Sequence, residues 1–175
     1  SLGAGQQAVP VAGRLLGLIS PHAGYMFSGP VASHAFARLR EEKPLPQTLI
    51  LFGPKHTHHG ARFSVSAADS WKTPLGDLAV DQALCRRLVA GAPALESDNG
   101  AHLYEHSLEV QIPFLQMVLE SFVLVPLAVG CASTASVAEI LDQLWGGDET
   151  LIVVSSDLSH FLPYSSAGIR DRMTC

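Results

Sequence analysis

The stretch "TLILFGPKHTHH", residues Thr48–His59, contains the pattern that decides the fold. After Thr48, its first residues are continuously apolar and do not alternate with polar ones. This is the pattern of a strand that is covered on both faces of a parallel sheet. A Gly-Pro pair ends the run, and His56, His58 and His59 follow at once. The stretch therefore predicts a buried strand that delivers histidine side chains to one edge of a sheet.

The rest of the chain repeats this pattern and alternates it with helical spacing. Three further apolar runs predict strands at Leu15–Ile19, Phe122–Ala128 and Leu151–Val154. Apolar residues at helical spacing predict helices over 29–42, 80–90, 105–121 and 134–145, with a kink at Pro113 in the third. Residues 62–81 predict a short strand followed by a loop that could cover a site. This order predicts an α/β fold with a mostly parallel central sheet sandwiched by helices.

Composition narrows the classes of protein that the chain could represent. Hydrophobic residues make up 47% of the 175 residues and charged residues 15%, which is a globular composition. Lysine and arginine are scattered and the net charge is −5, so we expect no nucleic-acid partner. We also expect no membrane partner, because no apolar run is long enough to span a bilayer. Cys85, Cys131 and Cys175 are odd in number and widely spaced, which favours a reducing, cytoplasmic compartment over a disulfide framework.

Three of the predicted strands run into strongly polar loops. The first is followed by His22 in "SPHAGY", the second by His56, and the fourth by "SSDLSH" with Asp157 and His160. In an open α/β sheet, ligands bind beyond the carboxyl ends of the strands. If these strands are parallel, His22, His56 and His160 converge on one crevice. Such convergence is typical of a metal site or an acid–base site.

A fourth polar element lies at the head of the predicted helix over 105–121. In "YEHSLEVQIPF", His106 and Glu109 are three residues apart and would share one helix face, and His102 would lie one turn earlier. Glu109 could act as an acid–base partner or only orient a histidine. His34, inside the predicted helix over 29–42, is interpreted as structural.

The residues at the strand ends suggest separate roles. His22 and His56 leave the first two strands and are the candidate metal ligands. Asp157 could support a ligand or only cap a turn, and His160 could transfer a proton because its ordinary pKa lies near neutrality. Tyr25 could hydrogen-bond a substrate oxygen. We expect Gly24 to let the backbone turn sharply around His22.

Six motifs occur in order along the chain: "PHAGYMFSG", "GPKHTHHG", "WKTPLGDLAVD", "EHSLEVQIPFLQ", "VPLAVG" and "SSDLSHF". Together, from Leu15 to Tyr164, they resemble the Memo family, also called AmmeMemoRadiSam system protein B. That family is similar to the class III extradiol dioxygenases in fold and in the location of its site. The resemblance implies a Memo-like domain over residues 1–175 and a functional link to AMMECR-type and radical-SAM proteins.

The resemblance also implies a set of site residues. By motif, His22 and His56 would be metal ligands, Asp157 and His160 would lie beside the metal, and His106 would join the site. Family members are associated with iron or copper, and a cysteine in a later TxCG-like stretch completes their site. That stretch would lie several tens of residues beyond "SSDLSH", so we expect the domain to be incomplete at its C-terminus.

Three functions stay open at this point. The first is a non-haem iron-dependent oxidoreductase of dioxygenase type, with catalytic roles for His160, Asp157, His106 and Tyr25. The second is a non-catalytic adaptor that binds a metal or a peptide, and the third is a zinc-dependent hydrolase. Imidazole and carboxylate ligands suit several metals, so Fe(II) is the first candidate and Cu or Zn remain possible. The substrate is a small molecule or a peptide that the motifs do not define.

Overall fold

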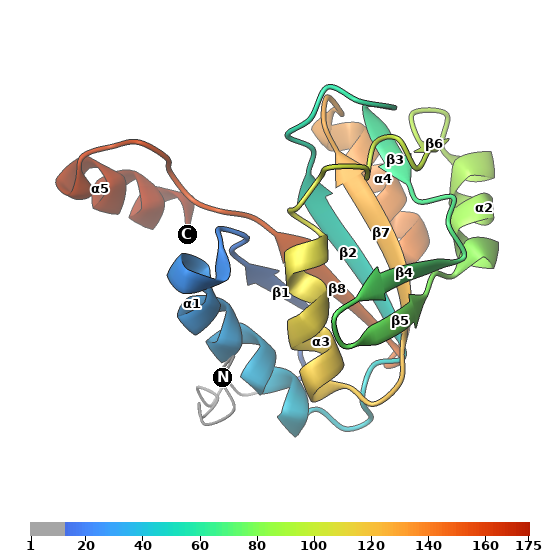
Figure 1. Ribbon diagram of the computed structural model, residues 1–175, viewed down its shortest axis with the longest axis horizontal. Helices are drawn as coiled ribbons and strands as arrows, with labels where there is room; N and C mark the ends of the chain where they lie inside the picture. Colours follow the sequence, from blue (N-terminus) through green and yellow to red (C-terminus); the bar gives the residue numbers. More distant parts are fainter. Residues whose placement is uncertain (1–12) are drawn as a thin grey trace.

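The computed structural model describes residues 13–175 and centres on a six-stranded sheet in the order β1–β8–β2–β7–β3–β6 (Figure 1). The four strands β1, β8, β2 and β7 are mutually parallel, whereas β3 runs antiparallel to β7 and parallel to β6. The strands of this sheet are β1 (Gly17–Ser20), β2 (Thr48–Pro54), β3 (Phe63–Val65), β6 (Glu96–Ser97), β7 (Val123–Val129) and β8 (Thr150–Ser155). The α/β fold with a mostly parallel sheet is confirmed, and the four predicted apolar runs form β1, β2, β7 and β8.

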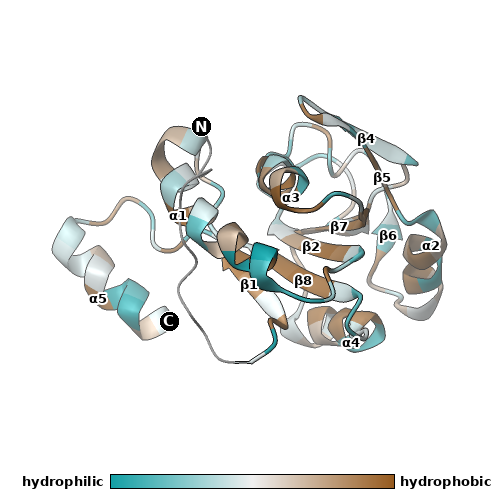
Figure 2. Cartoon of the chain, turned by 90° about the horizontal axis from the view of Figure 1, so that it is seen from below, coloured by the Kyte–Doolittle hydropathy of each residue, from teal (hydrophilic) through white to brown (hydrophobic). Residues whose placement is uncertain are grey.

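Helices cover both faces of the sheet (Figures 1 and 2). One face carries α1 and α3, and the other carries α2 and α4. Their bounds are α1 (Tyr25–Ala37), α2 (Gln82–Gly91), α3 (Ile112–Val118) and α4 (Thr134–Leu144). Along β2, Leu49 and Leu51 pack in the core beneath α1 and α3, whereas Ile50 and Phe52 pack in the core beneath α2 and α4. Both faces of this strand are buried, which is why its sequence does not alternate.

The predicted helix over 105–121 is wrong in its first part. The chain instead forms a turn, then the 3₁₀ helix η2 (Glu109–Gln111), and only then α3. Pro113 lies in the first turn of α3, where its missing N–H costs no helical hydrogen bond, so it starts a helix instead of kinking one. This shift moves His106 from a helix into a turn.

The predicted loop within residues 62–81 is more regular than expected. After β3 the chain forms a two-stranded antiparallel hairpin of β4 (Ser70–Thr73) and β5 (Gly76–Ala79). The predicted helix over 29–42 begins earlier, at Tyr25, and ends in the 3₁₀ helix η1 (Arg38–Glu41). The hairpin contacts α3 through a hydrogen bond of 2.7 Å that the Thr73 hydroxyl donates to the side-chain oxygen of Gln116.

The last helix, α5 (Tyr164–Thr174), has no buried residue and lies beyond α1 (Figure 1). Large apolar side chains are exposed on α5 and on the segment that leads to it, among them Phe161, Tyr164 and Met173. Within residues 13–175, we find no helix with the length and apolar content that crossing a bilayer requires.

One glycine lets two segments approach closely at the end of β2. A Cβ atom on Gly53 would lie 2.7 Å from the Leu108 side chain and 2.9 Å from the Ser107 hydroxyl. That hydroxyl also donates a hydrogen bond of 2.6 Å to the carbonyl of Pro54. The turn that contains His106 therefore rests directly on Gly53. By contrast, Gly24 has φ −50° and ψ 146°, and a Cβ atom there would meet nothing closer than 3.9 Å, so the expected role of Gly24 is wrong.

We predict that Gly53→Ala destabilises the protein by about 1–3 kcal/mol, because the added methyl group forces the turn at Ser107 and Leu108 to shift. The matched control Gly24→Ala should change the free energy of unfolding by less than about 0.5 kcal/mol. Urea-induced unfolding of both variants and the parent protein checks this. Equal midpoints for the parent and Gly53→Ala would contradict it.

Candidate metal centre

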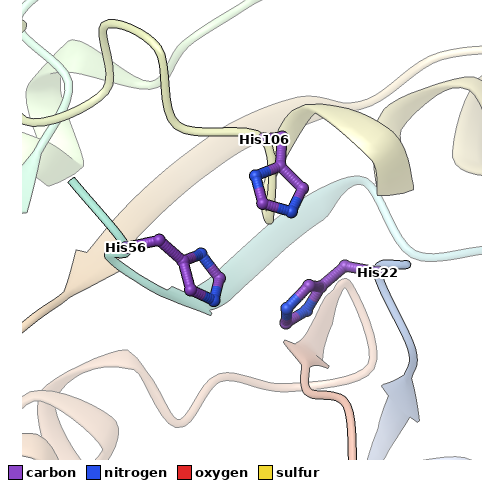
Figure 3. Close-up of side chains that lie close together, drawn as sticks. All are labelled: His22, His56 and His106. Carbon is purple, nitrogen blue, oxygen red and sulfur yellow. The ribbon is translucent and has the colours of Figure 1, made fainter. Parts of the chain in front are cut away.

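Three histidines converge at the carboxyl edge of the sheet (Figure 3). His22 follows β1, His56 follows β2, and His106 lies in the turn before η2. One imidazole nitrogen from each lies within 4.8 Å of the other two. The ring centroids are 5.3 Å apart for His22 and His56, 5.7 Å for His22 and His106, and 5.1 Å for His56 and His106. We call these three residues the histidine cluster.

The histidine cluster is closed on one side and open on the other. The His22 side chain is 3% exposed, whereas those of His56 and His106 are 45% and 53% exposed. Burial lowers the pKa of His22, and this effect outweighs the opposing attraction of Asp157. Burial therefore favours the neutral imidazole of His22, the form that binds metals, and a ligand can reach the cluster past His56 and His106.

Glu105 is the carboxylate that holds the cluster together. Its side chain is 1% exposed and accepts hydrogen bonds from the His56 ring Nδ1 at 3.0 Å and from the His56 backbone N–H. The backbone N–H groups of His106 and Ser107 also donate to it, each at 3.0 Å. Burial alone would raise the pKa of Glu105, but these hydrogen bonds outweigh it and lower the pKa to about 2.

The charge of Glu105 determines which nitrogen of His56 is available. An ionised carboxylate only accepts hydrogen bonds, so the His56 Nδ1 must carry the proton that it donates to Glu105. The lone pair of a neutral ring then lies on Nε2. Carboxylate–histidine pairs of this kind orient metal ligands in proteins.

Asp157 and His160 lie beside the cluster. The Asp157 Oδ1 accepts hydrogen bonds from the backbone N–H groups of His22 at 2.7 Å and Ala23 at 3.3 Å, which fixes the loop after β1. Its Oδ2 lies 3.7 Å from the His22 Nε2 and 3.6 Å from the His160 Nε2. The His160 side chain is 56% exposed. Asp157 thus links His22 to a solvent-exposed imidazole.

The structure does not bring every predicted residue into the histidine cluster. Among the described residues, the cluster includes His106, as the family motif implied, whereas His160, which the strand ends predicted in the same crevice, lies beside it next to Asp157. Tyr25 begins α1, and its hydroxyl donates a 3.2 Å hydrogen bond to the Val110 carbonyl. Together with Trp71 and Met117, Tyr25 lines an open cavity of about 700 Å³. The described lining of this cavity includes Glu105 but none of the three clustered histidines. Tyr25 therefore faces a neighbouring cavity.

Sequence reasoning missed Glu105 and favoured Glu109. Glu109 is exposed in η2, and the helical spacing that paired it with His106 does not exist, because the helix begins later. The available signal was the position of Glu105 next to His106 in the "EHS" motif. His102 is also separate from the cluster, since its ring packs edge-on against Trp71 at 5.4 Å and burial lowers its pKa to about 4.

The amino-acid sequence is similar to those of the proteins of one family. The model of the family described as Memo-like protein matches residues 8–174. A MEMO1 family protein of Sulfurisphaera tokodaii is 38% identical over 162 residues, which cover 89% of this chain and 57% of the relative. MEMO1 family proteins of Sulfolobus acidocaldarius and Methanococcoides burtonii are 41% and 42% identical, over 89% and 90% of this chain.

The chain is shorter than these relatives. It spans 57%, 56% and 59% of the lengths of the three proteins, respectively. The matched region nevertheless includes all three histidines of the cluster, together with Glu105 and Asp157. These five residues of the candidate metal centre therefore lie within the part of the chain that the family model matches.

We predict that Glu105 makes stability depend on pH in the acid range. Its pKa is about 2 in the folded protein, against an ordinary value of 4.5, so its contribution is complete above about pH 4.5 and is lost as the pH falls toward 2. The difference in free energy of unfolding between the parent and Glu105→Gln should shrink by about 2 kcal/mol from pH 6 to pH 3. Urea unfolding at both pH values measures this difference, and a constant difference would contradict the prediction.

Proposed function

The chain belongs to the Memo-like protein family, and on that premise we propose that its histidine cluster binds Fe(II) and supports an oxidation of dioxygenase type. The observation that supports this most directly is the convergence of His22, His56 and His106 within 4.8 Å. Three side chains from three separate segments meet at the sheet edge where α/β folds bind their ligands.

The donor set suits a catalytic metal ion. Neutral imidazoles are good ligands for Fe, Cu, Ni and Zn, and three protein ligands leave coordination positions open for a substrate. The exposed sides of His56 and His106 leave room for those positions. Glu105 behind His56, and Asp157 beside the Nε2 of His22, place two carboxylates next to the ligands, which favours a divalent cation.

The choice of iron follows the resemblance to the extradiol dioxygenases. Bound Fe(II) would supply redox chemistry with molecular oxygen as the oxidant. His160 would move protons between solvent and the site, because its ring is exposed and lies 3.6 Å from the Asp157 carboxylate. Asp157 would meanwhile hold His22 in place through the backbone N–H. The substrate would be a small molecule or peptide that approaches past His56 and His106.

We predict that the metal-free protein, handled anaerobically, binds one equivalent of Fe(II). The single variants His22→Ala, His56→Ala and His106→Ala should each weaken binding by more than about 100-fold, since each removes a ligand and not merely a supporting group. His34→Ala is the matched control, because His34 is exposed on α1 and should leave affinity unchanged. Titration with elemental analysis measures stoichiometry and affinity, and unchanged binding in the three variants would overturn the proposal.

Oxygen consumption then separates the possible functions. With Fe(II) bound, we expect consumption of oxygen in the presence of catechol-type compounds, and a loss of that activity in His160→Ala with Fe(II) affinity largely retained. Stoichiometric Fe(II) without oxygen consumption would overturn the oxidation and favour a metal-binding adaptor. Preferential Zn binding with oxygen-independent hydrolysis would overturn it in favour of a zinc hydrolase.

A further inference from the structure

Behind His22, on the side away from the solvent, lies the hydroxyl of Ser155. Ser155 ends β8 and is 1% exposed, and its Oγ lies 3.0 Å from the Nδ1 of His22. Two other groups contact the same oxygen: the side-chain Nε2 of Gln111 at 2.9 Å and the carbonyl of Ser107 at 2.6 Å. Gln111 is fully buried. Three segments of the chain, the loop after β1, the turn with η2, and the end of β8, therefore meet at one hydroxyl group.

The single proton of this hydroxyl can be assigned by elimination. The Ser107 carbonyl can only accept, so Ser155 donates its proton there. The Gln111 group that faces Ser155 is its NH₂ end, because the same nitrogen lies 2.9 Å from the Pro21 carbonyl, which also only accepts. Ser155 therefore has no proton left for His22, and it accepts one from Gln111.

His22 must then be the donor in its contact with Ser155. A neutral imidazole carries one N–H, so a proton on Nδ1 leaves the lone pair on Nε2. Asp157 does not compete for a proton on Nε2, because its Oδ2 lies 3.7 Å away, which is beyond hydrogen-bond distance. The opposite tautomer would require Ser155 to turn its proton toward His22, and the Ser107 carbonyl would lose the donor that Ser155 supplies.

We propose that Ser155, held by Gln111 and the Ser107 carbonyl, is a positioning residue that fixes His22 as the Nδ1–H tautomer and keeps its Nε2 free to bind a metal. The role of Ser155 in metal binding rests on the proposed function, whereas the tautomer of His22 is a property of the metal-free protein. His56 is prepared in the same way by Glu105, so two ligands are preset by two different acceptors, a hydroxyl and a carboxylate. Ser155 touches no reacting atom and acts only through His22.

The tautomer can be read directly by NMR. In metal-free protein labelled with ¹⁵N-histidine, two-bond ¹H–¹⁵N correlations distinguish the two neutral tautomers, and His22→Gln assigns the signal. We expect His22 of the parent protein to be Nδ1–H, and Ser155→Ala to convert a substantial fraction to Nε2–H. Ser156→Ala is the matched control, because that neighbouring side chain is exposed and should leave the signal unchanged.

The outcomes are decisive even if Ser155→Ala does not fold. An Nε2–H signal for His22 in the parent protein overturns the proposal by itself, and so does an unchanged Nδ1–H signal in a folded Ser155→Ala variant. Fe(II) affinity should fall by about 10–100-fold in Ser155→Ala and stay constant in Ser156→Ala. If the parent protein binds no metal, the proposed function fails while the NMR result still decides the tautomer.

Discussion

The parallel pairing of β1, β8 and β2 is the constraint on which the rest of the molecule depends. β8 lies between the other two strands, and the paired residues Ser20 and Ser155 show that β1 and β8 end level with one another. Because all three strands run in the same direction, their following loops leave the sheet at one edge. The loops that contain His22, His56 and Asp157 are therefore neighbours in space although they are far apart along the chain.

The third histidine depends on a different kind of contact. The turn that contains His106 lies between the edge strand β6 and η2, and it reaches the site by packing on Gly53, where a side chain would collide with Ser107 and Leu108. Glu105, in the same turn, then reaches across to the loop after β2 and binds His56 through both backbone and ring. The Glu105 side chain is only 1% exposed, and burying a carboxylate costs free energy unless each oxygen accepts hydrogen bonds. The turn and the loop after β2 supply the N–H groups that donate these hydrogen bonds.

Polar groups around the cluster form a network of hydrogen bonds that supports the ligands. Glu105 supports His56, Ser155 and Gln111 support His22, and Asp157 secures the loop after β1. Glu105, Ser155 and Gln111 are buried, whereas the opposite side of His56 and His106 is open. A metal ion held there would have a rigid protein wall on one side and access for a substrate on the other, which is the arrangement that a catalytic metal site requires.

The sequence by itself determined the four central strands, the mostly parallel α/β sheet and the placement of His22, His56, Asp157 and His160 just beyond strand ends. It could do so because continuous apolar runs and the residues that interrupt them are local signals. The family resemblance placed His106 at the site, but only the tertiary structure decided that its ring joins those of His22 and His56 while His160 lies beside them, and that Glu105, not Glu109, is the orienting carboxylate. Those assignments depend on where a turn between two elements packs, and no periodicity encodes that. Gly53 and Ser155 show the same limit, because each acts through contacts with residues far away in the sequence, 133 positions away in the case of Ser155 and His22, and these contacts exist only once the sheet has assembled.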